Sequence, residues 1–390
     1  MASRSRSTSA SEDISRSLPD RTRLMLAVAA GGRCEFAGCN DFLFEHHLTL
    51  RGGVFGQNAH IIAFSEDGPR AAAESNTEAV HAIGNLLLLC PKCHKYVDDE
   101  PSQFPTEVLR EYKRVHEARV RLVTGLGPDL RTEIVQLKAT VAGQNVGIPA
   151  PHVYEAVAPR YPADAQGFVI DLTALQCEDG SFYASAEKVI RRRVDQLFAP
   201  GVEPKGARHL SVFALAPIPV LILFGAILGN KVAADVYQRH RDTEDWKWKV
   251  DGAPIEYEFK RLRAGSPDGD VALALSLSGK IALDQVVASM GEAATVYELT
   301  LLGVPPQPTF LRLREDLSHF AAAYRDALAA LRAAHPGLAQ LGVFPAVPAP
   351  VAVVMGRELL PKIDPVLLVH DFDKVNGFQP RMKVNAYDPK

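Results

Sequence analysis

The chain has 390 residues, enough for two or three domains. Its 43 Lys and Arg residues are outnumbered by 46 Asp and Glu residues, which leaves a formal net charge of -3. This balance excludes a protein that binds nucleic acid through a basic surface over its whole length. Any contact with nucleic acid therefore requires a local basic patch.

The first 20 residues are rich in Ser and Arg and contain no apolar run. We expect a disordered tail over residues 1–20 rather than a secretory signal. The cysteines that follow have a metal-binding pattern, which requires reduced thiols. The absence of a signal and the reduced thiols together predict a cytoplasmic location.

Four cysteines form two short pairs, Cys34-x4-Cys39 and Cys90-x2-Cys93. Two such pairs, separated by a longer segment, can wrap one tetrahedral Zn2+ with four thiolates. A site closed by four protein ligands leaves no position for a substrate, so this zinc would stabilise a small domain. The fifth cysteine, Cys177, is expected to be a buried thiol.

The residues that could carry chemistry lie between the cysteine pairs and directly after them. His60 ends a short predicted strand, Asn85 precedes the apolar run LLLL, and His94 follows the last paired cysteine. These pieces predict a strand, a loop and a helix with polar groups on one side. The order His, Asn, His resembles the HNH nuclease family, whose ββα-metal finger uses these residue types. The resemblance covers about residues 33–118.

The resemblance implies a role for each of the three residues. His60 would be the general base that deprotonates a water for attack on a phosphodiester. Asn85 would hold the loop that carries His60 and orient its ring. His94 would bind a catalytic divalent cation, Mg2+, which neutralises charge on the scissile phosphate and the leaving oxygen.

The chain departs from the family directly before the general base. Many members have an Asp there as a second metal ligand, whereas this chain has Ala59. Asn58 lies on the strand face of His60 by alternation and is the replacement ligand that we expect. Four other nearby polar residues are alternative candidates, and for each of them a surface position is the favoured interpretation: Glu45, His46, His47 and His81.

A predicted helix over residues 106–123 offers a local basic patch within the expected HNH domain, residues 21–124. Its cations are Arg110, Lys113, Arg114, Arg119 and Arg121. Three glutamates are interleaved with them, so an ordinary solvated helix face is an equally good interpretation. Gly and Pro residues then predict a linker over residues 125–150, with a helix over residues 129–142 inside it.

The stretch from Leu210 to Gly229 has no charged residue over 20 positions, the length of a transmembrane helix. Pro217 and Pro219 would break such a helix near its middle. We therefore predict a buried strand, a Pro-x-Pro turn and a helix. The pattern has a second copy whose helix contains Arg357, so we expect no contact with a membrane.

The two copies form an internal repeat with an offset of 131 residues. The identical pairs include Phe213 with Phe344, Pro217 with Pro348, Pro219 with Pro350 and Gly225 with Gly356. A helical pattern precedes each copy and an apolar strand follows it, so the repeats lie near residues 185–240 and 317–371. This order predicts two Rossmann-like α/β halves with parallel sheets and one shared cleft.

Residues just after the apolar strands predict what the cleft binds. Aromatic residues lie beside cations in the segment from Tyr237 to Trp248, which suits stacking of bases and pairing of phosphates. The run Ser276 to Gly279 could bring backbone N–H groups to a phosphate. The structural alternatives are packing anchors and an ordinary turn. The candidate ligand-binding residues are Lys231, Tyr237, Arg239, His240, Arg241, Trp246, Trp248, Ser276, Ser278, Gly279, Pro348 and Arg357.

Through these segments, together with Phe213 to Pro219 and Phe344 to Arg357, residues 151–390 resemble the SAVED domain. SAVED is a fusion of two CARF-like halves that senses cyclic oligonucleotides. An HNH nuclease joined to SAVED is similar to the effector endonucleases of bacterial CBASS anti-phage defence. The fold implied is a zinc-stapled α+β HNH (ββα-metal) domain followed by an α/β SAVED domain of two Rossmann/CARF-like halves.

The function implied is a metal-dependent endonuclease that a cyclic di- or trinucleotide activates. It would degrade double-stranded DNA nonspecifically in abortive infection. Ligand binding to SAVED would drive formation of a homo-oligomer, a dimer or an active tetramer. The sequence leaves open the bases and the linkages of the ligand.

Two alternatives come from other functional classes. A restriction-type HNH enzyme would use its C-terminal half to bind modified DNA, and the apolar repeat argues against that. A ligand-gated DNA-binding protein would not cleave, and His60 and His94 would then be incidental residues beside a zinc knuckle. The first would cut modified DNA without any nucleotide, and the second would be unaffected by His60→Ala.

Overall fold

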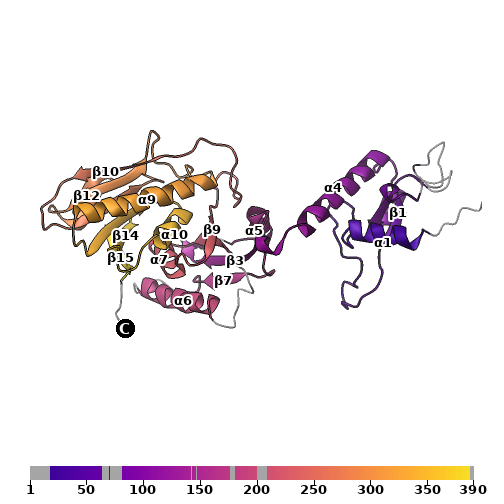
Figure 1. Ribbon diagram of the computed structural model, residues 1–390, viewed down its shortest axis with the longest axis horizontal. Coiled ribbons are helices and arrows are strands. Elements are labelled where there is room, and N and C mark those ends of the chain that lie inside the picture. Colours follow the sequence, from indigo (N-terminus) through magenta and orange to yellow (C-terminus); the bar gives the residue numbers. More distant parts are fainter. Residues whose placement is uncertain are drawn as a thin grey trace, which may run out of the picture. The chain divides into compact units, whose positions relative to one another are not determined.

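A computed structural model describes residues 18–63, 70, 81–141, 143–145, 147–175, 181–199 and 209–386. Most of the expected tail and Cys177 lie outside the described residues. The chain divides into two units, residues 1–126 and 127–390, and each is described by itself (Figure 1).

The first unit contains the expected β–β–α order. β1 (Gln57–His60) pairs antiparallel with β2 (Leu86–Leu89), and His60 lies opposite Leu86. The short 3-10 turn η1 (Ile83–Asn85) leads into β2, and α3 (Pro91–Asp99) follows it. Pro91 starts α3, a position where the missing N–H costs no helical hydrogen bond.

Two further helices complete this unit, α1 (Asp20–Ala29) and α4 (Thr106–Thr124). Leu26 of α1 and Leu109 of α4 are buried in one core with apolar side chains of the finger: Ile61, Leu86 and Val97. The apolar run of β2 is buried on both faces, because the strand lies between these helices and the rest of the finger.

The second unit begins with a sheet of five strands that are all parallel. The strands are β3 (Arg131–Lys138), β6 (Tyr161–Pro162), β7 (Phe168–Asp171), β8 (His209–Leu215) and β9 (Ala233–Tyr237). β3 lies inside the sheet and contacts β6, β7 and β8.

The helix predicted over residues 129–142 is therefore wrong. Ile134, Val135 and Leu137 are buried, and their side chains supply both faces of β3. A strand inside a parallel sheet needs such continuous apolar character, which resembles a helical pattern in a short segment. Much of the expected linker is thus part of the second unit.

The second sheet has six strands in the order β10-β12-β11-β13-β14-β15. They are β10 (Tyr257–Arg263), β11 (Val271–Ser276), β12 (Thr295–Leu301), β13 (Gln340–Ala346), β14 (Val366–Asp373) and β15 (Gly377–Val384). The four inner strands are parallel, whereas the two edge strands β10 and β15 are antiparallel to their neighbours. The sheet is thus mixed, not wholly parallel as expected.

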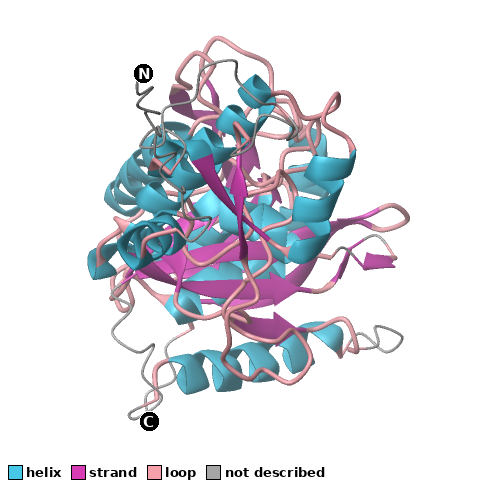
Figure 2. Cartoon of the chain, turned by 90° about the vertical axis from the view of Figure 1, so that its right-hand side faces the viewer, coloured by secondary structure: helices cyan, strands magenta, loops and turns pink. Residues whose placement is uncertain are grey.

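Helices alternate with these strands and cover the sheets (Figure 2). They are α5 (Ala150–Val157), α6 (Phe182–Leu197), α7 (Ile218–Leu228), α8 (Leu283–Met290), α9 (Arg314–Ala334) and α10 (Ala349–Arg357). The turn η2 (Pro128–Leu130) and the small hairpin of β4 (Thr140–Val141) and β5 (Gln144–Asn145) flank β3.

The internal repeat is visible in the positions of these elements. β8 and β13 begin at His209 and Gln340, and α7 and α10 begin at Ile218 and Ala349. Both pairs of elements keep the offset found in the sequence.

The charge-free stretch is divided between β8 and α7. No helix in the described ranges has the length and apolar character that crossing a membrane requires.

α7 and α10 pack tightly against each other and join the two halves (Figure 1). The contact is made by Gly225 and Gly356, the glycine pair of the repeat. A Cβ atom at Gly225 would lie 2.0 Å from the carbonyl oxygen of Val353, and one at Gly356 would lie 1.9 Å from that of Ile222. Only glycine lets the two backbones approach this closely.

Candidate functional site

The four paired cysteines come together in the first unit, and their Sγ atoms all lie within 4.8 Å of one another. Two backbone amides donate to these sulfurs: the N–H of Cys90 to Cys34 at 3.3 Å, and the N–H of Cys93 to Cys90 at 3.4 Å. Cys90 is also the N-cap of α3, so the helix start fixes its side chain.

Four clustered thiols with amide donors fit a thiophilic tetrahedral ion, and Zn2+ is the ion typical of such a set. Burial raises the pKa of the Cys34 thiol to about 12. A bound cation would therefore be needed to ionise this thiol at neutral pH. The site has no open position for a substrate, which gives it a structural role.

His60 ends β1 and is partly buried. Burial, together with the nearby His81 and His94, lowers the pKa of His60 below its ordinary value. The imidazole is therefore neutral at neutral pH and can accept a proton. The rings of His60 and His81 have centroids 5.9 Å apart, so His81, expected at the surface, lies beside the candidate base.

Asn85 is buried, and both polar atoms of its side-chain amide form hydrogen bonds with the backbone of Ile62. Its Oδ1 accepts the N–H of Ile62 at 2.9 Å, and its Nδ2 donates to the carbonyl of Ile62 at 3.1 Å. Its own carbonyl accepts the N–H of Ile61 at 2.9 Å. These bonds fix the two residues after His60, which is the geometry that the expected holding role requires.

His94 lies in the first turn of α3 and has partners on both ring nitrogens. Its Nδ1 is 2.8 Å from Oε1 of Gln57, and its Nε2 is 3.4 Å from Oδ2 of Asp98. Ala59 is buried in the core, as strand alternation requires. Asn58 lies on the face of His60 but has no hydrogen bond to His94 in the described part of the chain.

Most cations of α4 are held by partners within the first unit. Arg114 pairs with Glu111 at 2.5 Å, and Lys113 is buried between Glu117 at 2.5 Å and Glu35 at 3.7 Å. Burial raises the pKa of Glu35 to about 7 despite the adjacent ammonium. Arg119 donates to Asn40 at 2.5 Å. These contacts within the unit argue against a dedicated DNA-binding patch on α4.

Sequence reasoning missed three residues around this site, Gln57, Arg70 and Asp98, and it favoured the surface for His81. Asp98 had a usable signal, since it follows His94 by four positions on a predicted helix and so shares its face. Gln57 and Arg70 had none, because their contacts join segments that are distant in the sequence.

In the second unit, a cavity of about 550 Å³ lies where parallel strands of both sheets end. Its walls come from both halves. Leu215 ends β8 and Ala216 follows it, Gln238 to Arg241 follow β9, and Val347 follows β13. This is the shared cleft expected at the carboxyl ends of the strands.

Two helix N-termini also meet this cavity. Ile218 and Ala349, the first residues of α7 and α10, both line it. The N–H of a first helical residue has no partner within its helix, and the helix dipole is positive there. The pseudo-symmetric Pro-x-Pro turns thus present two electropositive backbone ends to one space, which suits an anion.

Five of the predicted ligand residues line the cavity: Arg239, His240, Arg241, Ser278 and Pro348. In the described part of the chain, no acidic side chain pairs with the guanidinium of Arg239 or of Arg241. Burial lowers the pKa of His240 below its ordinary value. The cavity therefore holds two available cations and a neutral imidazole, with Glu244 as its acidic residue.

Seven predicted ligand residues do not line it. Tyr237 stacks on Phe213 with centroids 4.5 Å apart, and the buried Trp246 meets the same ring edge-on at 5.3 Å. These two are packing anchors, because their strand and loop face the core. Trp248 is partly buried beside His240, at 6.0 Å between centroids.

The remaining four predicted residues have other positions. The buried Ser276 accepts the N–H of Ile281 at 3.2 Å and closes a turn, and Gly279 lies within that turn. Arg357 ends α10, opposite to its cleft end, and donates to the carbonyl of Val232 at 3.0 Å. Lys231 is exposed and lies just before the amino end of β9, whereas the cavity lies at the carboxyl ends of the strands.

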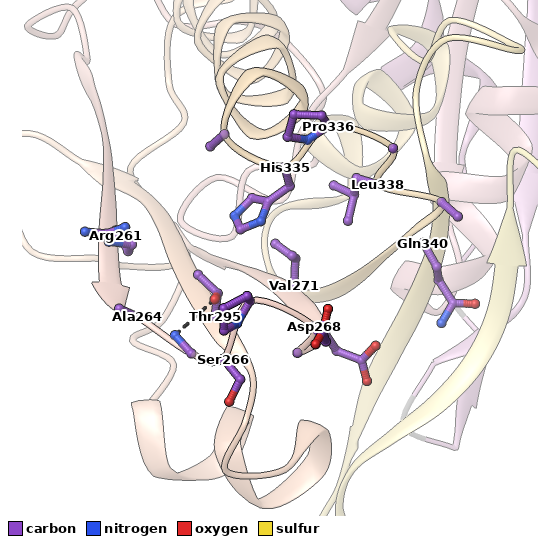
Figure 3. Close-up of a pocket in the computed structure, with 17 residues that line it drawn as sticks. Arg261, Ala264, Ser266, Asp268, Val271, Thr295, His335, Pro336, Leu338 and Gln340 are labelled. Atoms are coloured by element: carbon purple, nitrogen blue, oxygen red, sulfur yellow. Dashed lines mark hydrogen bonds between the residues drawn. The ribbon is translucent and has the colours of Figure 1, made fainter.

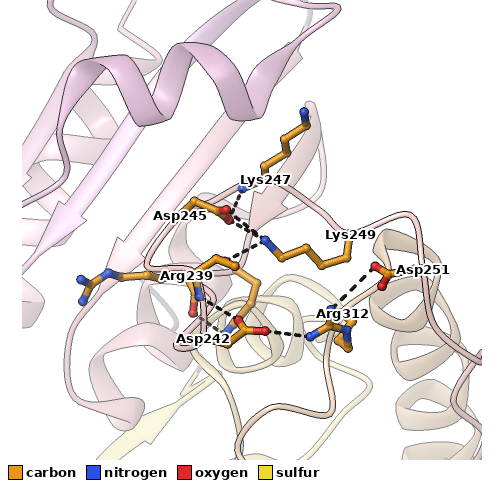
Figure 4. Close-up of polar contacts among 9 residues, drawn as sticks. Arg239, Asp242, Asp245, Lys247, Lys249, Asp251 and Arg312 are labelled. Carbon is orange, nitrogen blue, oxygen red and sulfur yellow. Dashed lines mark hydrogen bonds and ion pairs between the residues drawn. The ribbon is translucent and has the colours of Figure 1, made fainter.

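Ion pairs hold the segment that carries the cavity cations (Figure 4). Arg312 pairs with Asp242 at 2.9 Å and with Asp251 at 3.7 Å. Lys249 pairs with Asp245 at 2.9 Å. Because these acids already have cationic partners, they compete little for Arg239 in the same segment.

A second cavity of about 640 Å³ lies at the amino ends of the strands of the six-stranded sheet (Figure 3). The turns over residues 264–270 and 335–339 form much of its wall, with His335 hydrogen-bonded to Tyr297 at 3.0 Å. Its charged residues Arg261, Asp268 and Asp270 carry mixed signs. It is larger than the shared cleft, but its aspartates outnumber its arginine, whereas the shared cleft has two arginines and one acidic residue, Glu244.

Residues 190–384, half of the chain, match the family model of SAVED, the SMODS-associated and fused to various effectors sensor domain. The chain belongs to the SAVED family. Residues 34–100 match the model of HNH_2, an HNH endonuclease. The sequence prediction of an HNH domain followed by a SAVED domain is confirmed.

The chain is also similar in structure to proteins that have been solved. It matches the Cap4 SAVED/CARF-domain receptor of Acinetobacter baumannii, solved with the cyclic trinucleotide 2'3'3'-cAAA, at 14% identity and a TM-score of 0.44. That match covers 81% of this chain and 68% of the other.

The Moraxella osloensis Cap4 receptor matches at 13% identity and a TM-score of 0.37, over 75% of this chain and 60% of the other. At these TM-scores the likenesses support no inference about ligand or activity. No curated protein matches the chain.

Proposed function

We propose that this SAVED protein is a metal-dependent DNA endonuclease that a cyclic di- or trinucleotide activates. The observation that carries the proposal is the joining of two sites in one chain. One unit holds an HNH finger with a neutral histidine, and the other holds a two-sided cleft with two available arginines.

The catalytic part rests on how the finger holds its groups. His60 accepts a proton from the attacking water, and its lowered pKa keeps it in the accepting form. Asn85 fixes the backbone after His60, so the imidazole keeps one position. The side-chain oxygen Oε1 of Gln57 fixes the tautomer of His94, with the proton on Nδ1.

The residues fit a divalent cation. His94 would hold it through Nε2, and Asn58 remains the second ligand that the sequence suggested. Bound Mg2+ would supply charge neutralisation at the scissile phosphate and the leaving oxygen. The four cysteines would hold a separate structural Zn2+ that keeps α3, and with it His94, in place.

The sensing part rests on the cleft. Its volume of about 550 Å³ lies within the range of small-molecule sites, which is about 300–1,000 Å³. Arg239 and Arg241 would pair with phosphates, assisted by the amino ends of α7 and α10. Because both halves supply walls, one cyclic ligand would contact both and bias how they pack.

A nonspecific nuclease damages its own genome, so its active state must be rare without the ligand. A ligand shifts such an equilibrium only by its difference in affinity for the two states. Homo-oligomers, dimers or active tetramers, would bring fingers together so that both strands of double-stranded DNA are cut. We place this activity in the cytoplasm, in anti-phage defence of the CBASS type that ends in abortive infection.

The test uses purified wild-type and His60→Ala protein with plasmid DNA and Mg2+, with and without a panel of cyclic di- and trinucleotides. Degradation by the wild type alone, and with one member of the panel alone, supports the proposal and identifies the ligand. Cleavage without any nucleotide contradicts the gating. Equal cleavage by His60→Ala contradicts the assigned base.

A further inference from the structure

The surroundings of His94 contain a carboxylate that the HNH comparison leaves unassigned. The oxygen Oε1 of Gln57 can only accept a hydrogen bond, so Nδ1 of His94 donates to it at 2.8 Å. A histidine binds a cation through an unprotonated nitrogen, and with the proton on Nδ1 that nitrogen is Nε2, on the other side of the ring. There it lies 3.4 Å from Oδ2 of Asp98.

Two lone-pair donors at this distance, the imidazole nitrogen and the carboxylate oxygen, can both bind a cation that lies between them. A histidine that binds a metal through one nitrogen usually donates its other N–H to an oxygen of the protein, as His94 does to Gln57. Adjacent ligands of an octahedral ion with bonds of about 2.1 Å lie about 3 Å apart. The pair of His94 and Asp98 is close to that spacing before any ion binds.

Arg70 holds the other side of the Asp98 carboxylate. Its Nη2 is 3.4 Å from Oδ1 of Asp98, while its Nη1 donates to the carbonyl of Val97 at 3.1 Å. Its Nε donates to the carbonyl of Ile61, next to the candidate base, at 3.0 Å. With Oδ1 engaged by the guanidinium, Oδ2 is the oxygen left to face His94.

Arg70 thus joins the segment after His60 to the helix of His94. Its side chain is 7% exposed, whereas the Asp98 side chain is 46% exposed. The buried guanidinium orients the carboxylate, and the exposed carboxylate remains open to a cation from solvent.

We propose that Asp98 is the carboxylate ligand of the catalytic cation and that Arg70 is its positioning residue. Asp98 takes the role of the Asp that many HNH nucleases have at the position of Ala59. The proposal rests on the proposed nuclease function for the identity of the cation site. The buried Ala59 has no ligand atom, and α3 supplies one from four positions after His94 instead.

Asp99 provides a matched control. It lies on the same helix, carries the same charge, and is 53% exposed, but it pairs with Lys95 at 2.6 Å rather than with His94. Asp98→Asn and Asp99→Asn therefore remove the same charge one residue apart. A general electrostatic effect would change both variants, and a ligand role changes one.

The experiment measures Mn2+ binding to the zinc-loaded full-length protein by titration calorimetry. We expect Asp98→Asn to weaken Mn2+ binding at least about tenfold, the loss that removing even an outer partner of a metal site causes. Asp99→Asn should stay within about twofold. His94→Ala should lose the same binding event, and adding Asp98→Asn to it should cause little further loss.

Plasmid cleavage with an activating nucleotide and increasing Mg2+ supplies the second measurement. Asp98→Asn should lower the cleavage rate, whereas Arg70→Lys should mainly raise the Mg2+ concentration needed for half-maximal rate. Asp98→Glu should recover part of the Mn2+ affinity.

Wild-type affinity for Mn2+ in Asp98→Asn would overturn the proposal even if the wild type cuts DNA. If the wild type binds Mn2+ through Asp98 but cuts no DNA with any nucleotide, the proposed function fails and the ligand assignment stands.

Discussion

The two units differ in how their functional residues are fixed. In the HNH unit, residues that are far apart in the sequence converge through short-range bonds: the cysteines on one another, Asn85 on Ile62, and His94 on Gln57. In the SAVED unit, the cleft is formed by strand ends and helix starts of two pseudo-symmetric halves. For the HNH site, spacing in the sequence suggests individual residues. For the SAVED cleft, it suggests only the place in the fold, at the ends of the strands.

The largest expected effect separates the units by their dependence on metal. Chelation of zinc, or Cys90→Ser, should unfold the HNH unit, because a structural zinc site contributes about 10 kcal/mol or more of folding free energy. The SAVED unit has its own core and should keep its thermal transition and its nucleotide binding. Differential scanning calorimetry before and after chelation checks this, with restored zinc as the control. Loss of both transitions together would show that the units do not fold independently.

The next effect concerns the packing of the two SAVED halves. Gly225→Ala should destabilise the SAVED unit by about 3 kcal/mol, because its Cβ would lie 2.0 Å from a backbone oxygen of α10. Gly147→Ala is the matched control, since a Cβ there has no atom within 4 Å. The midpoints of thermal unfolding of the two variants measure the difference. Equal midpoints would mean that α7 and α10 do not pack as closely as described.

A smaller effect distinguishes the cleft from the sites that the sequence suggested. Arg241→Ala should weaken binding of the activating nucleotide about tenfold, the effect of one charge-assisted bond of about 1.5 kcal/mol. Lys231→Ala should leave binding unchanged, because Lys231 lies near the amino end of β9 and the cleft lies beyond its carboxyl end. Calorimetric titration of both variants tests the placement of the ligand. A loss with Lys231→Ala alone would move the site away from the cleft.

The smallest effect is in the pH dependence of cleavage. His60 must be neutral to accept a proton, and its pKa lies below the ordinary 6.5 because of burial and neighbouring histidines. Activity should therefore persist at pH 6.5 and fall as the pH drops through the lower pKa. The pH profile of kcat/KM, measured with saturating nucleotide, gives this value. An acid midpoint above 6.5 would contradict His60 as a buried base.

The sequence predicted the elements that follow from local patterns. The cysteine pairs, the order of His60, Asn85 and His94, and the offset between Gly225 and Gly356 all reflect short-range chemistry or repetition. β3 was predicted as a helix because a buried parallel strand lacks the alternation of an exposed one.

The predicted ligand residues show where sequence reasoning ends. Tyr237 and Trp246 have the composition of a base-stacking surface, yet both pack against Phe213. The direction of such a side chain depends on which sheet face is covered, and that depends on tertiary packing. Arg239 and Arg241 reach the cleft because they follow the carboxyl end of β9.

The most direct test of the central claim compares two curves for the wild-type protein. Nucleotide occupancy is followed by calorimetry, and the rate of plasmid cleavage is followed over the same nucleotide concentrations. A SAVED sensor that gates an HNH nuclease predicts no cleavage at zero occupancy and a rate that rises as the cleft fills. Cleavage at zero occupancy, or a filled cleft with no cleavage, would contradict the account.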